Sequence, residues 1–223
     1  EPTAAALAYG YGVGITDEHR RILVFDLGGG TFDVSIIELN YGVVDVLATG
    51  GDNLLGGDDF DEALADMLAD VFEEDHGINL RGDHRAWARL LRAAEDAKIA
   101  LSTAGTTDVN LEFIATDRNG HALHLMQEVA RHEFEALLAP FLTRMAGCID
   151  QTLADAGLTT QQIDRVLLVG GSTRIPAVID LVTASLAQDP HMELDPDAAV
   201  AMGAAVQASI IAGVDVDAIL VDV

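Results

Sequence analysis

The sequence contains one cysteine, one lysine and few aromatic residues, and it has no long apolar run. Because Cys148 is alone, the chain cannot form an internal disulfide. Every apolar run is shorter than a membrane-spanning helix requires, and the first residues lack a basic segment followed by an apolar one. We therefore expect neither a membrane span nor a secretion signal, and the cysteine usage fits the reducing cytoplasm.

Basic residues are also scarce. The chain has 12 lysines and arginines against 37 aspartates and glutamates, which gives a formal net charge of -25. Nucleic acids and anionic membranes both require clustered basic side chains, so the charge argues against either partner. A basic protein surface is a better match, although the acidity is equally typical of a surface adapted for solubility or salt.

With 223 residues, half of them hydrophobic, the chain can bury a core in one large or two small domains. The most informative segment is 26–33, where three glycines lie between two short apolar runs and an aspartate stands at each end. The runs 22–25 and 34–37 predict adjacent strands joined by a tight turn. Glycine lets backbone N–H groups approach a phosphate, while Asp26 could hold hydrated magnesium and Thr31 could bind a phosphate oxygen. An ordinary hairpin turn would have the same glycines but needs neither side chain.

The only lysine lies in segment 89–102, which is rich in alanine, leucine and arginine and predicts a helix. Glu95, Lys98, Ile99 and Ser102 are three or four residues apart, so they share one face of this helix. Such a face could bind the hydroxyls of a ribose and the edge of a base. It could equally be a solvated face with one ion pair.

A second glycine segment follows the buried-type strand at 166–169. The pair at 170–171 is followed by Ser172 and Thr173, either of which could cap a helix with Pro176 in its first turn. Junctions of this kind often form ligand-binding edges in α/β sheets, although a simple strand-to-helix turn explains the pattern as well.

Periodicity and turn residues predict the remaining elements. The expected strands are 23–25, 31–39, 43–48, 107–115, 122–128 and 166–169. A helix is expected before the first strand, and further helices at 59–74, 85–101, from about 131 to 156, after 173 and at 199–212. Asn119-Gly120 marks the turn of a hairpin, and small residues in 201–205 would allow the last helix to pack closely. A smaller unit of about 56–132 is thus expected within a larger, discontinuous one.

Six segments, 1–10, 26–33, 56–61, 95–102, 169–176 and 195–208, follow the order of a known family. Together they resemble the ATPase domain of the 70-kDa heat-shock chaperones, of the bacterial DnaK type. The resemblance implies an α/β fold: an actin-like (ribonuclease H-like) ATPase lobe with an inserted smaller α+β subdomain. It implies a larger nucleotide-binding subdomain at 1–55 and 133–213, an inserted subdomain at 56–132 and an interdomain linker at 214–223. The pattern at 218–221 alone would also suit an extra strand.

The resemblance also assigns functional residues for ATP or ADP and magnesium. Asp26 would contact magnesium through water, and Asp26, Thr31 and Glu1 would serve catalysis. Arg174 and Ile99 would contact opposite faces of the base, while Glu95 and Lys98 would contact the ribose. The residues expected to bind the nucleotide are Gly28, Gly29, Gly30, Thr31, Gly57, Glu95, Lys98, Ile99, Ser102, Gly170, Gly171, Ser172, Arg174, Ile175 and Asp197.

The function implied is that of an ATP- and ADP-binding lobe of a chaperone active in the stress response. Its parent would couple ATP hydrolysis to the binding and release of unfolded polypeptide during protein folding. The family's first lobe and peptide-binding domain have no counterpart in the sequence, so we expect weak ADP binding and little ATP turnover by this chain alone.

The expected partners are J-domain co-chaperones and GrpE-type nucleotide-exchange factors. A second hypothesis is a partner-docking module with little nucleotide binding of its own. A sugar or acetate kinase half would need a substrate pocket that the sequence does not indicate. Leu54, Asp195 and Ala198 depart from the family pattern, which indicates a divergent member.

Overall fold

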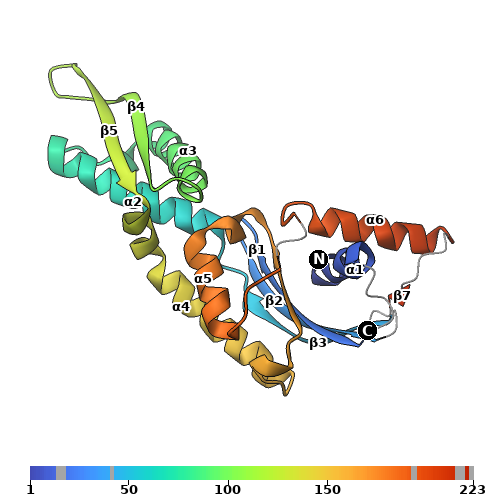
Figure 1. The fold of residues 1–223 in the computed structure, drawn as a ribbon. Coiled ribbons are helices and arrows are strands. Elements are labelled where there is room, and N and C mark those ends of the chain that lie inside the picture. Colours follow the sequence, from blue (N-terminus) through green and yellow to red (C-terminus); the bar gives the residue numbers. More distant parts are fainter. Residues whose placement is uncertain (14–18, 41–42, 192–194, 214–218, 221–223) are drawn as a thin grey trace. The chain divides into compact units, whose positions relative to one another are not determined.

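The protein is described by a computed structural model that covers residues 1–13, 19–40, 43–191, 195–213 and 219–220 (Figure 1). The chain divides into two compact units. Unit 1 is formed by Glu1–Gly56 and Leu142–Val223, and unit 2 by Gly57–Phe141. The boundary after 141 falls within one continuous helix, α4 (Arg131–Asp155).

Unit 1 is built on a five-stranded sheet with the order β6-β1-β2-β3-β7. Strands β1 (Arg20–Leu27), β2 (Phe32–Asn40) and β3 (Val43–Asp52) form an antiparallel meander. Strands β6 (Arg165–Val169) and β7 (Ile219–Leu220) add in parallel to β1 and β3 respectively. The run 22–25 is fully buried, as expected for a central strand covered on both faces.

Helices cover both faces of this sheet (Figure 1). Helix α1 (Pro2–Val13) packs on one face, where Ala5 and Ala6 join the core cluster that includes Ile22 and Val24. Helix α6 (Ala199–Ile211) lies against α1. The other face is covered by α5 (Pro176–Leu186) and the second half of α4. Two short 3₁₀ turns complete the unit: η2 (Thr160–Gln162) precedes β6, and η3 (Gly171–Arg174) precedes α5.

Unit 2 pairs two helices with a hairpin. Helix α2 (Gly57–His76) packs against α3 (His84–Leu101), and the 3₁₀ turn η1 (Leu80–Gly82) joins them. The Asp83 carboxylate accepts hydrogen bonds from the N–H groups of Arg85 and Ala86 and so caps α3. The predicted hairpin is formed by β4 (Thr106–Thr116) and β5 (Ala122–Ala130).

Several local expectations need correction. Neither Ser172 nor Thr173 caps α5, because residues 171–174 form η3 and the Thr173 hydroxyl donates to the Gly170 carbonyl instead, at 2.7 Å. Pro176 is the first residue of α5, as predicted. In the tail, Ile219–Leu220 form strand β7, which pairs with Val43–Val44 of β3. An extra strand here is the alternative that the apolar pattern at 218–221 allowed. Residues 214–218 and 221–223 of the expected linker lie outside the described residues, and the linker remains a prediction.

Candidate functional site

The glycine segment between β1 and β2 forms a tight turn that exposes its backbone. The Gly28 N–H donates to the Thr31 carbonyl at 3.0 Å, and Gly29, Gly30 and Thr31 are exposed. Gly56 closes against this turn, since a Cβ atom on Gly56 would collide with the Gly29 carbonyl. The backbone at Gly56 therefore packs against one side of the turn, and the exposed side of the turn can receive a ligand.

The second glycine segment lies beside the first. Asp26 on β1 pairs with Val169 on the parallel strand β6, so the two strands end at the same edge of the sheet. Gly170 has a φ of +86°, and a Cβ atom there would collide with the Leu27 carbonyl. Its N–H donates to the Pro196 carbonyl at 3.1 Å. The fold thus brings 28–31, 170–171 and the segment before α6 to one edge of unit 1.

Asp26 provides the acidic group at this edge, and it is 9% exposed. Burial, followed by the negative charges of Glu1 and Asp33, raises the pKa of Asp26 to about 6. Three carboxylates so arranged favour a nearby cation. No cluster of three or more His, Cys, Asp or Glu side chains that could hold a metal directly occurs among the described residues. The expected contact of Asp26 with magnesium through water remains a prediction.

Arg174 is fixed by two carboxylates that precede α6. Its guanidinium donates to Asp195 at 2.6 Å and to Asp197 at 2.8 Å, and these interactions raise the pKa of Arg174. Asp197 also lies close to Gly171, where an added Cβ would come within 3.1 Å of a carboxylate oxygen. Arg174 remains about half exposed, so its planar face is accessible for stacking.

The other predicted residues lie on α3 of unit 2. Ile99 is 61% exposed, whereas Lys98 is 9% exposed and lies against α2. The Lys98 ammonium donates to the Asp61 carboxylate at 2.7 Å and to the Gly57 carbonyl at 3.0 Å. Glu95 pairs with Arg92, with a nitrogen-to-oxygen distance of 3.6 Å, and the Ser102 hydroxyl donates to the Lys98 carbonyl.

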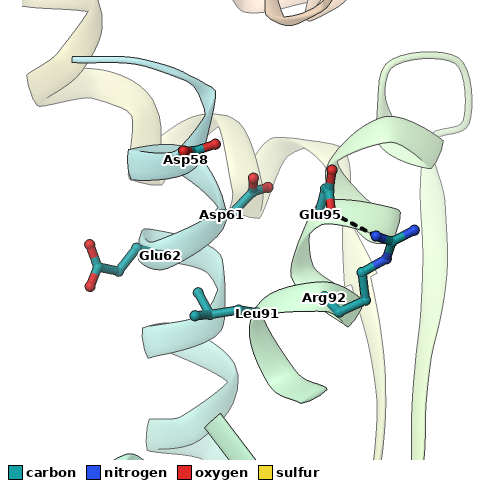
Figure 2. Close-up of a pocket in the computed structure, with 6 residues that line it drawn as sticks. All are labelled: Asp58, Asp61, Glu62, Leu91, Arg92 and Glu95. Carbon is teal, nitrogen blue, oxygen red and sulfur yellow. Dashed lines mark ion pairs between the residues drawn. The ribbon is translucent and has the colours of Figure 1, made fainter. Parts of the chain in front are cut away.

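Between α2 and α3 lies a cavity of about 470 Å³ (Figure 2). Its lining is mainly acidic. The lining residues are Asp58, Asp61, Glu62, Leu91, Arg92 and Glu95. Figure 2 shows Asp61 and Glu95 extending from the two helices beside this cavity.

The structure thus places the predicted residues in two groups, one in each unit. Unit 1 brings together the residues at the sheet edge. These are Glu1, Asp26, Gly28, Gly29, Gly30, Thr31, Gly170, Gly171, Ser172, Arg174, Ile175 and Asp197. The whole of Ile175 is only 3% exposed, so it has little surface for contact with a ligand. Gly57, Glu95, Lys98, Ile99 and Ser102 belong to unit 2.

Sequence reasoning gave no role to Asp61 or Gly56. Both lie in the segment 56–61 that it identified, but their partners are distant in sequence: Lys98 follows Asp61 by 37 residues. The contacts of Asp61 with Lys98 and of Gly56 with the glycine turn become visible only in the three-dimensional packing. In the part of the chain that the structure describes, no helix is both long and apolar enough to cross a membrane.

Comparison with known proteins adds independent information. The family model for the Hsp70 protein matches residues 1–223. The chain is 50% identical over 227 residues to the chaperone protein DnaK of Thermotoga maritima and 49% identical over 224 residues to that of Thermus thermophilus. Each alignment covers all of this chain but only 38% and 36% of those relatives, so the chain spans less than two fifths of their length.

Proposed function

The chain belongs to the Hsp70 family, and from this premise we propose that it is an ATP- and ADP-binding part of a DnaK-type chaperone. The mixed helix and sheet of unit 1 agree with the actin-like ATPase fold of that family. In the intact parent, ATP hydrolysis would drive cycles of polypeptide binding and release. A cytoplasmic location is part of the proposal and is consistent with the single cysteine.

One observation carries the proposal: two glycine segments meet backbone to backbone at the ends of adjacent parallel strands. Apart from those of Gly28 and Gly170, which donate within the chain, the N–H groups of these segments can approach phosphate oxygens without steric hindrance from side chains. Asp26 would orient water on a magnesium ion, which would neutralise phosphate charge, and Thr31 would donate its hydroxyl to a phosphate. Arg174 would stack on the base, and Lys98 would donate to the sugar.

A calorimetric titration with ADP and magnesium tests this proposal. We expect saturable, weak binding by the unaltered chain, and an affinity about tenfold lower for Lys98→Ala and for Arg174→Ala, because each loses a direct contact. Arg85→Ala is the matched control, since Arg85 is an exposed cation at the opposite end of α3. Absence of binding by a folded chain would contradict the proposal and favour the partner-docking hypothesis.

A specific observation in unit 2 supports docking of a GrpE-type exchange factor. Phe113 has a φ of +53°, which is unusual for a bulky residue, and the residue is 66% exposed. The Arg89 guanidinium donates to the Phe113 carbonyl at 3.0 Å, and the Phe113 N–H donates to the His124 ring at 3.2 Å. Phe113 also lines a cavity of about 490 Å³ next to Arg85 and Arg89. An exposed aromatic ring held in a strained conformation is well suited to anchor a partner protein.

The docking proposal is tested by measuring binding of a purified GrpE-type factor to Phe113→Ala. We expect affinity to fall about tenfold or more, as for an aromatic residue at the centre of an interface. Leu54→Ala is the control, because Leu54 is an exposed apolar residue of unit 1. Equal losses in both variants would show that Phe113 has no special role.

J-domain binding is the remaining partner proposal, based on the net charge of -25. Charge reversal at Asp45, on β3, should weaken binding of a basic J-domain and leave ADP affinity unchanged. Asp108→Lys, on β4 of unit 2, is the control. Asp215, the other acidic residue expected to contribute, lies outside the described residues.

A further inference from the structure

The Lys98 ammonium is held in unit 2 by two acceptors from one turn of α2. Asp61 accepts at 2.7 Å and the Gly57 carbonyl at 3.0 Å. Gly57 and Asp61 are four residues apart, so they lie on the same face of α2. The side chains of Lys98 and Asp61 are each 11% exposed. The pair is therefore largely buried in unit 2 and keeps a small exposed surface.

This arrangement restricts the lysine strongly. An ammonium has three N–H donors on a flexible four-carbon stem. Two donors are occupied by α2, so the direction of the third is fixed by the tetrahedral geometry of the nitrogen. A buried ammonium also needs an opposite charge beside it, and the Asp61 carboxylate at 2.7 Å supplies that charge. Asp61 thus supplies both the charge balance and the orientation of Lys98.

Asp61 has properties that its ion pair alone does not explain. Its Oδ1 atom is buried and has no hydrogen-bond partner among the described residues. Burial raises the pKa of Asp61, and the hydrogen bond from Lys98 opposes this shift. A half-satisfied buried carboxylate costs stability. Asp61 lines the cavity together with Glu95 (Figure 2). Glu95 precedes Lys98 by three residues on α3.

We propose that Asp61 is a positioning residue for nucleotide binding: it orients the Lys98 ammonium and leaves one N–H for the 2′ and 3′ hydroxyls of the nucleotide sugar. The inference rests on the proposed function and deepens it. Asp61 acts only through Lys98, and it makes the sugar hydroxyls a determinant of affinity.

The experiment compares ADP with 2′,3′-dideoxy-ADP, each with magnesium, in calorimetric titrations of the full chain. We expect the unaltered chain to prefer ADP by about tenfold, as for loss of a hydrogen bond to a charged donor. In Asp61→Asn the preference should fall to within about twofold, while affinity for the dideoxy nucleotide stays unchanged. Glu62→Gln is the matched control, because Glu62 lines the same cavity without bonding to Lys98, and it should retain the preference.

Two results would overturn the inference alone. One is an Asp61→Asn variant that keeps the full preference for ADP, and the other is an equal loss of affinity for both nucleotides, which indicates a merely structural role. If the unaltered chain, shown to be folded, binds neither nucleotide, the proposed function fails as well.

A second measurement needs no variant and therefore does not depend on Asp61→Asn folding. Lys98 is the only lysine of the sequence, so a ¹⁵N NMR spectrum contains one lysine ammonium signal. We expect this signal to shift on addition of ADP and to shift much less on addition of the dideoxy nucleotide. Equal shifts with both nucleotides would contradict the role of the hydroxyls.

Discussion

At the scale of single residues, Asp26 shows how a functional position can cost stability. The carboxylate is buried at the edge of the sheet, close enough to Glu1 and Asp33 for their charges to act on it. A cation bound nearby would balance these charges. Without one, burial and the two neighbouring carboxylates raise the pKa of Asp26 to about 6. Binding of magnesium and loss of the Asp26 proton should therefore be linked.

Asp26→Asn tests that cost. Because the folded-state pKa is raised, the folded chain binds more protons than the unfolded chain between about pH 4 and pH 6, and stability falls as pH rises through this range. The shift of about two pKa units corresponds to about 3 kcal/mol. The variant should therefore be more stable than the unaltered chain above pH 6 by up to about this amount, and the difference should vanish near pH 4.

Urea unfolding across this pH range measures the difference between the two curves. Glu74→Gln removes the same charge from an exposed position on α2 and should show little of the effect. A difference curve without a slope between pH 4 and pH 6 would mean that Asp26 titrates normally.

At the scale of elements, the packing of α1 against α6 depends on small residues. A Cβ atom on Gly203 would collide with the Ala4 carbonyl of α1. The contact is between a glycine and backbone, so neither helix can yield by changing a rotamer. This explains why the alanine-rich α6, with its single glycine at 203, can lie against α1, which itself packs on the sheet.

Gly203→Ala should consequently destabilise the chain by about 1–3 kcal/mol, the range for overpacked cores, despite the better helix propensity of alanine. Gly147→Ala is a matched control in α4, where an added Cβ meets no atom within 4 Å. That substitution should stabilise by up to about 1 kcal/mol. Denaturant unfolding of both variants measures the contrast, and similar behaviour of the two would disprove the close contact.

At the scale of the whole molecule, a net charge of -25 opposes folding through self-repulsion. Ion pairs such as those of Arg81 with Asp66 and Asp70 provide local attraction. With 37 acidic against 12 basic residues, however, most carboxylates cannot be paired. Screening by salt should thus remove more repulsion than attraction.

We therefore expect the melting temperature to rise by several degrees, roughly 2–5 °C, between about 20 mM and about 0.5 M sodium chloride. Differential scanning calorimetry measures this change, and sorbitol at equal osmolality controls for effects unrelated to charge. A melting temperature that falls with salt would show that the ion pairs outweigh the general repulsion.

The sequence by itself determined the features that depend on neighbouring residues. The alternation of apolar runs and glycines predicted the turn at 28–31 between β1 and β2, and Asn119-Gly120 predicted the turn of the β4–β5 hairpin. Helix propensity predicted α3 and the residues that share its face. The order of the motifs also indicated the Hsp70 family, which the family match confirms.

The tertiary structure alone decided which of these residues have partners and which remain accessible. Helical spacing placed Lys98 and Ile99 on one face, but packing against α2 buries Lys98 and leaves Ile99 exposed. The Lys98–Asp61 bond and the contact of Gly56 with the glycine turn join residues distant in sequence. Local propensities contain no information about such contacts, because they form only when separate elements pack together and exclude water.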